Sequence, residues 1–290
     1  MPKYKRSIAV GITDTHGGNK LALLNPDTIL EDEDREGNIS PYHPGMTDVQ
    51  KYLWDLYAWA KGEIEHLAGH DPIHLFHIGD QTQGNKYPHE WVSTRLSDQL
   101  DIATWNLMPW LEMKNVQTVR MAKGTASHEF GEGSAPVLIQ RRLQAQFPKK
   151  DIKTVFHGLV SVGGIRIDYS HHGPFPGSRN WLKGNEARYY LRSLMMDEIA
   201  AGNNPPDVVW RGHYHEYIRE WLEVRGNGHR YASWLMIIPS MSMVDAYARQ
   251  AARSPSRVSN GMVALEIING KIHDIHPFIK SMDIRTREEL

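Results

Sequence analysis

The chain has 290 residues, of which 40% are hydrophobic and 23% charged, as in an ordinary globular protein with a full core. Its 33 Lys and Arg against 34 Asp and Glu argue against binding through a basic tail. The absence of Cys excludes disulfide scaffolds, thiol nucleophiles and Cys-ligated zinc. No apolar run approaches the about 20 residues of a membrane span. We therefore expect a cytoplasmic protein with no membrane partner.

Apolar runs and helical periodicity predict strands that alternate with helices, followed by a strand-rich end. Thr47 is the predicted N-cap of the first helix. In chain order the prediction is strand 6–13, loop 17–46, helix 47–69, strand 73–78, helix 93–112, strand 116–122, helix 135–146, strands 154–162 and 165–170, helix 185–201, and strands 207–211, 217–224, 231–238, 262–268 and 271–278. This order indicates a layered α/β fold with an antiparallel C-terminal portion. No linker divides the chain, so we expect a single domain over 1–290.

Polar groups follow five of the predicted strands, at the edge where ligands bind in open α/β sheets. They are Asp14-Thr15-His16, Gly79-Asp80, GTASHE at 124–129, SHHG at 170–173 and GHYH at 212–215. Carboxylate and imidazole groups together suit Mn, Fe, Zn and similar divalent ions. Each group alone is better explained as capping or surface residues, and only their joint order favours a metal site.

That joint order resembles the calcineurin-like metallophosphoesterase superfamily, whose pattern runs Asp-x-His, Gly-Asp, Gly-Asn-His-Asp/Glu, His and Gly-His-x-His. The resemblance spans Asp14 to His215. The stretches TDTHGGNKLALLNP, GTASHEFGEG and PDVVWRGHYH look like members encoded by phages and prophages, which implies the host cytoplasm as the location. The family's fold is an α/β sandwich of two mixed sheets flanked by helices.

The resemblance implies a dinuclear metal centre that hydrolyses phosphodiester bonds through a bridging hydroxide. Its implied cofactors are two divalent ions, with Mn favoured and Fe, Zn, Ni or Mg as alternatives. Asp14, His16 and His215 would hold one ion, Asp80 would bridge both, and His213 with His171 or His172 would hold the other. We favour His171, which is closer to the strand end. The implied role of His128 is to protonate the leaving alkoxide or to stabilise the phosphoryl oxygens, with Glu129 orienting it.

One ligand of the family pattern is missing here. Thr125, Ala126 and Ser127 separate Gly124 from His128, where the family has a single Asn. Thr125, Ser127 or water could fill the vacant position, and Asn85 is a remote candidate. The second metal site is therefore predicted to be looser.

The expected partner is a phosphoester substrate, with nucleic acid or nucleotides as the favoured class. Trp181 in a predicted loop, flanked by Arg179 and Lys183, could stack on a base and contact phosphate. Arg249, Arg253 and Arg257 could line a basic edge, although a solvated surface explains them as well. The alternatives are a phosphomonoesterase acting on phosphoprotein or small phosphates, and a non-catalytic binding protein with a degenerate metal site.

Overall fold

Strand β1, Arg6–Ile12, is an almost wholly buried apolar run that lies near the centre of a six-stranded sheet. The computed structural model describes residues 5–130, 134–177, 180–244, 257–286 and 288–289. The sheet has the order β13-β12-β1-β4-β5-β6. Strands β1, β4, β5 and β6 run parallel, β12 pairs antiparallel with β1, and β13 pairs antiparallel with β12. The other strands are β4 Ile73–His77, β5 Val116–Ala122, β6 Asp151–Val155, β12 Arg257–Ile268 and β13 Lys271–Asp283.

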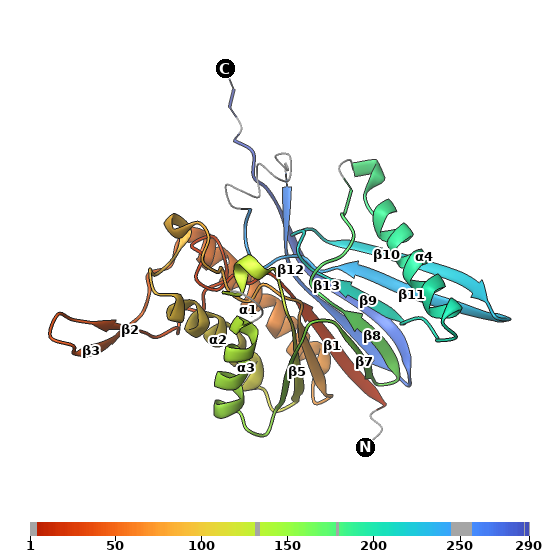
Figure 1. Ribbon diagram of the computed structural model, residues 1–290, viewed down its shortest axis with the longest axis horizontal. Coiled ribbons are helices and arrows are strands. Elements are labelled where there is room, and N and C mark those ends of the chain that lie inside the picture. Colours follow the sequence, from red (N-terminus) through yellow and green to blue (C-terminus); the bar gives the residue numbers. More distant parts are fainter. Residues whose placement is uncertain (1–4, 131–133, 178–179, 245–256, 287, 290) are drawn as a thin grey trace.

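A second, five-stranded sheet has the order β10-β11-β9-β8-β7 and is also mixed. Strands β8, β9 and β11 run parallel, while β7 and β10 pair antiparallel at the two edges. Its strands are β7 Gly158–Val162, β8 Ile165–Tyr169, β9 Val208–Arg211, β10 Ile218–Gly226 and β11 His229–Ile237. A two-stranded ribbon, β2 Leu30–Glu33 and β3 Ile39–Tyr42, projects from one end of the molecule (Figure 1).

Within the described ranges four α-helices flank the sheets, three beside the six-stranded sheet and one beside the five-stranded sheet (Figure 1). They are α1 Asp48–Ala68, α2 Leu96–Leu111, α3 Ser134–Gln146 and α4 Asn185–Ala200, and the short 3₁₀ turns are η1 Pro88–Glu90, η2 Ala126–His128 and η3 Asn180–Leu182. Thr47 caps α1 as predicted, because its side chain accepts from Gln50 N–H while the Gln50 side chain accepts from Thr47 N–H. No helix in the described part of the chain is long and apolar enough to cross a membrane.

Alternate residues of β1 serve two separate cores. Ile8, Val10 and Ile12 pack toward the helices, whereas Ala9 belongs to the apolar cluster that joins the two sheets. In that cluster the Phe76 ring meets the rings of Tyr169 and Trp210 edge to face, at centroid distances of 5.1 and 5.2 Å. The two larger sheets therefore pack face to face, as expected for a two-sheet α/β arrangement.

Several predicted elements differ from the structure. Strand β12 begins at Arg257 rather than at residue 262, and β13 continues to Asp283 rather than ending at residue 278. The predicted loop 17–46 contains the β2–β3 ribbon, which sequence periodicity misses because its side chains are mostly exposed and charged. The single strand predicted over 154–162 is two strands, since β6 ends the six-stranded sheet and β7 begins the edge of the other. Helix α2 begins at Leu96 rather than at residue 93.

Candidate metal centre

The chain segments that follow β1, β4, β8 and β9 meet at one edge of the two sheets. Asp14 N–H donates to Gly79 O over 3.2 Å, and Gly212 N–H donates to His171 O over 2.9 Å. These bonds tie the turn after each strand to the turn after its neighbour. Parallel strands end at the same edge, so these four polar groups are brought together here. The fifth group, GTASHE after β5, joins them through Thr125 and His128.

The backbone at this edge adopts an uncommon conformation at five of the candidate ligands. The φ angles are 52° at Asp14, 38° at His16, 51° at Asp80, 76° at His213 and 52° at His215. Positive φ is uncommon for residues other than Gly and costs free energy, so it persists where the surrounding structure enforces it. The strained turns direct these side chains toward one another.

Asp14 is the centre of the first cluster and has no exposed surface. Its Oδ2 accepts from Thr13 Oγ1 at 2.7 Å and from His213 N–H at 3.1 Å. Its Oδ1 lies 3.2 Å from His215 Nε2 and 3.7 Å from His16 Nε2. Burial alone would raise the pKa of Asp14, but His215 and His16 outweigh it and hold that pKa well below its usual range. Asp14 is therefore ionised, with two imidazoles beside one oxygen.

His171 belongs to two groups of ligand candidates, one with His172 and His213 and the other with Asp14 and Asp80. His171 Nε2 lies 3.0 Å from Asp80 Oδ2, while His171 Nδ1 donates to Ile78 O over 2.7 Å. A further group joins Asp80 with His16 and His128, so Asp80 lies between His16 and the residues around His171. Burial opposes ionisation of both partners, but His171 keeps the pKa of Asp80 below its usual range and Asp80 raises the pKa of His171 to about 9.

Thr125, the first of the three residues between Gly124 and His128, lies next to Asp80. Its backbone N–H donates to Asp80 Oδ1 over 2.6 Å, and its Oγ1 lies 3.3 Å from Asp80 Oδ2. The same oxygen is 3.5 Å from His172 Nε2 and 3.5 Å from His213 Nδ1. Of the substitutes considered from sequence, Thr125 is thus the one placed inside the cluster, while Asn85 has an exposed side chain.

His128 lies beside the first cluster, with its ring centroid 4.6 Å from that of His16. Its Nδ1 donates to Gln83 O over 2.6 Å, which leaves Nε2 as the nitrogen free of that bond. Burial lowers the pKa of His128, and repulsion by His16 adds to the effect. Glu129, which was expected to orient His128, accepts from Gly124 N–H. The His128 ring is instead held by Gln83 O, a partner that the sequence did not reveal.

Two glycines, Gly79 and Gly124, pack so closely on the candidate ligands that no side chain fits at either position. A Cβ at Gly124 would lie 2.0 Å from Asp80 Oδ1, and one at Gly79 would lie 2.4 Å from His171 Nδ1. Real Cβ atoms do not approach other atoms so closely. The glycines of the Gly-Asp and GTASHE groups therefore let backbone pack directly on the ligand side chains.

The buried polar atoms of the site fit a bound cation. Asp14 Oδ1, His16 Nδ1, His16 Nε2 and His171 Nε2 are buried without a hydrogen-bond partner among the described residues. An unpaired buried polar group typically costs about 1–3 kcal/mol. Four groupings of three His or Asp residues have ligand atoms within 4.8 Å of one another. Carboxylate oxygens with imidazole nitrogens suit divalent ions of the Mn, Fe and Zn type, so these residues can hold metal.

Two serines support the site from the segment between β11 and β12, where the sequence offered no signal. Ser240 Oγ donates to Asp14 O over 3.3 Å, and Ser242 Oγ lies 3.5 Å from His215 Nδ1. Second partners of this kind orient a ligating imidazole and fix its tautomer. Residues 245–256, which include the predicted basic positions Arg249 and Arg253, lie outside the described residues.

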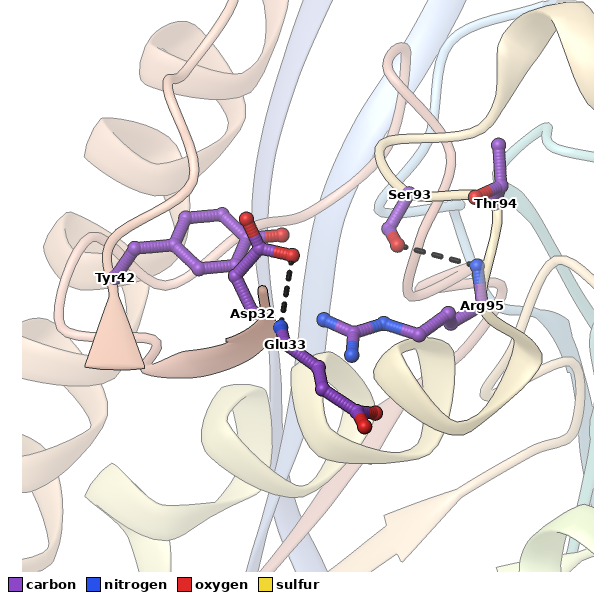
Figure 2. Close-up of a pocket in the computed structure, with 6 residues that line it drawn as sticks. All are labelled: Asp32, Glu33, Tyr42, Ser93, Thr94 and Arg95. Atoms are coloured by element: carbon purple, nitrogen blue, oxygen red, sulfur yellow. Dashed lines mark hydrogen bonds between the residues drawn. The ribbon is translucent and has the colours of Figure 1, made fainter. Parts of the chain in front are cut away.

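Of the groups predicted to contact substrate, Trp181 is 75% exposed and Lys183 pairs with Glu216. Arg179 lies outside the described residues. The β2–β3 ribbon and the segment before α2 line an open groove of about 600 Å³, which is not part of the metal-ligand cluster (Figure 2). Its lining residues are Asp32, Glu33, Tyr42, Ser93, Thr94 and Arg95. None of these six belongs to the four groupings of metal-ligand candidates.

Neither a scan against protein-family models nor a search of curated proteins finds a match for this chain.

Proposed function

We propose that this protein is a metal-dependent hydrolase of phosphodiester bonds that works with two divalent cations at the Asp and His cluster. One observation carries the proposal. Asp80 is buried between two sets of ligand candidates, one containing His16 and the other Asp14 and His171. A carboxylate in that position can be shared by two cations, which is the arrangement of two-metal phosphoester hydrolases.

Asp14, His16 and His215 would hold the first cation, and His171 with His213 would hold the second, with Asp80 common to both. When bound, the two cations neutralise charge on a phosphoryl group and lower the pKa of a water molecule. The unpartnered atoms Asp14 Oδ1, His16 Nε2 and His171 Nε2 support this assignment, because a cation gives each of them a partner.

The role assigned to His128 is that of a general acid, which requires its doubly protonated imidazolium form, because Nδ1 already carries the hydrogen donated to Gln83 O. The proton on Nε2 then goes to the leaving oxygen, and the lowered pKa of His128 makes this form a stronger but less populated acid. As the bond from water oxygen to phosphorus forms and the ester bond from phosphorus to the leaving oxygen breaks, that oxygen gains negative charge. The hydrogen bond from Nδ1 to Gln83 O keeps the ring oriented while Nε2 transfers its proton. General-acid help of this kind contributes about 10²–10⁴ in rate.

Aromatic side chains beside the cluster support a substrate that carries a base. The Tyr214 ring lies 5.0 Å from the His213 ring, and Phe175 packs edge-on against Tyr214 at 5.5 Å. Phe175 is 47% exposed. Exposed rings next to a phosphate site allow stacking worth about 1–3 kcal/mol per base. This favours nucleic acid or nucleotides over a phosphoprotein.

The proposal is tested by stripping the full chain of metal and assaying it with and without Mn²⁺. The substrates are a bis-aryl phosphate, an aryl phosphate, cyclic nucleotides, and single- and double-stranded DNA. We expect metal-dependent turnover of the diesters. Faster turnover of the aryl monoester would instead favour a phosphomonoesterase, and bound metal without turnover of any substrate would favour a binding protein.

A further inference from the structure

We propose that His172 is a protein ligand of the second cation, so that this site consists of three imidazoles and the Asp80 carboxylate. The inference rests on the proposed metal centre and deepens it. It assigns both members of the His171-His172 pair to the same ion, with His213 as the third imidazole, and it replaces the expected neutral Asn ligand by a nitrogen ligand.

The three imidazoles face one another. Ring centroids are 4.9 Å apart for His171 and His172, 4.8 Å for His172 and His213, and 5.1 Å for His171 and His213. One nitrogen from each ring lies within 4.8 Å of a nitrogen from each of the others. Three nitrogen donors that converge on a common space form one face of a coordination shell.

The chain on either side of His172 is anchored, so its position is built into the fold. His171 before it is fixed by the bond from Nδ1 to Ile78 O. Gly173 after it packs so closely on Arg211 that a Cβ would lie 2.5 Å from Arg211 Cγ. Arg211 is itself fully buried and lies 2.7 Å from an Asp168 carboxylate oxygen. A larger residue at 173 would move the loop, so the glycine keeps His172 beside the cluster.

His172 also approaches the place left by the missing Asn. Its Nε2 lies 3.5 Å from Thr125 Oγ1, the oxygen that reaches Asp80 Oδ2 at 3.3 Å. The Thr125 hydroxyl donates its hydrogen toward the Asp80 carboxylate, and a neutral hydroxyl is a weak metal ligand. The neighbouring imidazole nitrogen is the stronger donor for a borderline divalent ion.

A set of three imidazoles and one carboxylate has a different metal preference from a set containing an amide oxygen. Nitrogen ligands favour Zn²⁺, Co²⁺ or Ni²⁺, whereas oxygen-rich sets suit Mg²⁺ and Mn²⁺. The second site therefore discriminates against Mg²⁺ more strongly than a site with Asn would, and removal of His172 reduces that discrimination.

The test measures metal binding and needs no activity. The full chain is stripped of metal and titrated with Zn²⁺ by calorimetry, and with Co²⁺ by visible absorption, which reports the ligands around the ion. The variants are His172→Ala, Thr125→Val, and His229→Ala as a control at an exposed histidine in β11. Circular dichroism checks folding, and His172→Gln replaces His172→Ala if the alanine variant does not fold.

We expect wild type and His229→Ala to bind two ions. His172→Ala should keep the first ion at unchanged affinity and bind the second at least about 10-fold more weakly, since even loss of a partner outside the ligand shell costs about 10–100-fold. Unchanged affinity for both ions in His172→Ala overturns the assignment, as does an equal loss at both sites. A loss confined to Thr125→Val assigns the position to Thr125 instead. Wild type that binds no metal contradicts the proposed function as well.

Discussion

His171 Nε2 and Asp80 Oδ2 lie 3.0 Å apart in the interior, where His171 is 1% exposed and Asp80 is 2% exposed. The other ring nitrogen of His171 donates to Ile78 O, so the ring is held in place independently of Asp80. A buried carboxylate in this position cannot lose its charge without leaving the surrounding imidazoles unbalanced. Asp80 is therefore the residue on which both halves of the proposed centre depend.

We expect Asp80→Asn to lower diester hydrolysis by on the order of 10³-fold or more and to reduce the number of bound ions, with the fold retained. The substitution preserves the shape of the side chain but removes the negative charge that two cations would share. For comparison, removal of a single hydrogen-bond donor from an active site lowers kcat by about 10²–10³-fold. Turnover, metal content and circular dichroism check this. Asp55→Asn on the exposed face of α1 is the control and should behave as wild type. Near-normal turnover of Asp80→Asn with saturating Mn²⁺ would contradict the shared role.

We expect His128→Ala to slow hydrolysis of esters with alkoxide leaving groups by about 10²–10⁴ and to affect nitrophenyl esters much less. An alkoxide needs a proton in the transition state, whereas a nitrophenolate leaves as a stable anion. The measurement is the ratio of wild-type to variant kcat on the two substrate types with metal content held equal. Equal losses on both would indicate that His128 acts on phosphate binding or on metal, not as the acid.

Metal removal should destabilise the protein, because the candidate ligand atoms come within 4.8 Å of one another only in the folded chain, so a bound cation stabilises the folded state. A ligand that binds only the folded state adds about 2.7 kcal/mol when its concentration is about 100 times Kd. We therefore expect the melting temperature to fall after chelation and to recover when Zn²⁺ or Mn²⁺ is added. His215→Ala should recover less than wild type. A melting temperature that is insensitive to both treatments would argue against a metal centre.

His77 is buried under the site in a hydrogen-bond chain that suits only its neutral form. Gln81 Nε2 donates to His77 Nδ1 over 3.2 Å, so His77 Nε2 carries the hydrogen and donates to Thr15 Oγ1 over 2.9 Å. Gln81 is held in that orientation by its bond to Ala122 O at 3.0 Å. Burial lowers the pKa of His77 to about 3, from an ordinary value of 6.5.

The metal-free protein should therefore lose stability in acid through His77. Between pH 6.5 and about 3 the unfolded chain binds a proton at this histidine and the folded chain does not, so the free energy of unfolding falls as pH falls. At about pH 5 the loss from this residue is about 2 kcal/mol relative to neutral pH. Urea unfolding at both pH values checks this against His77→Gln, which does not titrate. Parallel pH dependences of wild type and His77→Gln would contradict the assignment.

The strands that carry the site could be predicted because each is a short apolar run. The β2–β3 ribbon could not, since Glu31, Asp32 and Glu33 give it no apolar face. The sequence also did not predict that the run from residue 154 to residue 162 divides into β6 and β7, which belong to different sheets. Phe156 and His157 lie where the chain leaves one sheet for the other, and period-two patterning does not record which sheet a strand joins.

The identities of the candidate ligands could be read from the sequence, but their supports could not. The contact between Thr125 N–H and Asp80 joins residues 45 positions apart, and that between Ser240 and Asp14 joins residues 226 positions apart. Such partners depend on the tertiary fold. The positive φ at Asp14 and Asp80 also follows from the bonds between neighbouring turns rather than from the residues themselves.

Gly124 offers a test of this close packing that leaves every candidate ligand in place. In Gly124→Ala the new Cβ would lie 2.0 Å from Asp80 Oδ1, so either the Thr125 loop or the Asp80 carboxylate must move. We expect weaker metal binding and a large loss of diester hydrolysis, because displacements of about 1 Å at an active site can cost about 10²-fold. Gly62→Ala is the matched control, since it lies inside α1 with no atom within 4 Å of its Cβ. That control should keep full activity and gain about 0.5–1 kcal/mol of stability from the better helix former. If Gly124→Ala binds metal and turns over substrate like Gly62→Ala, then the contact between this glycine and Asp80 does not position the site.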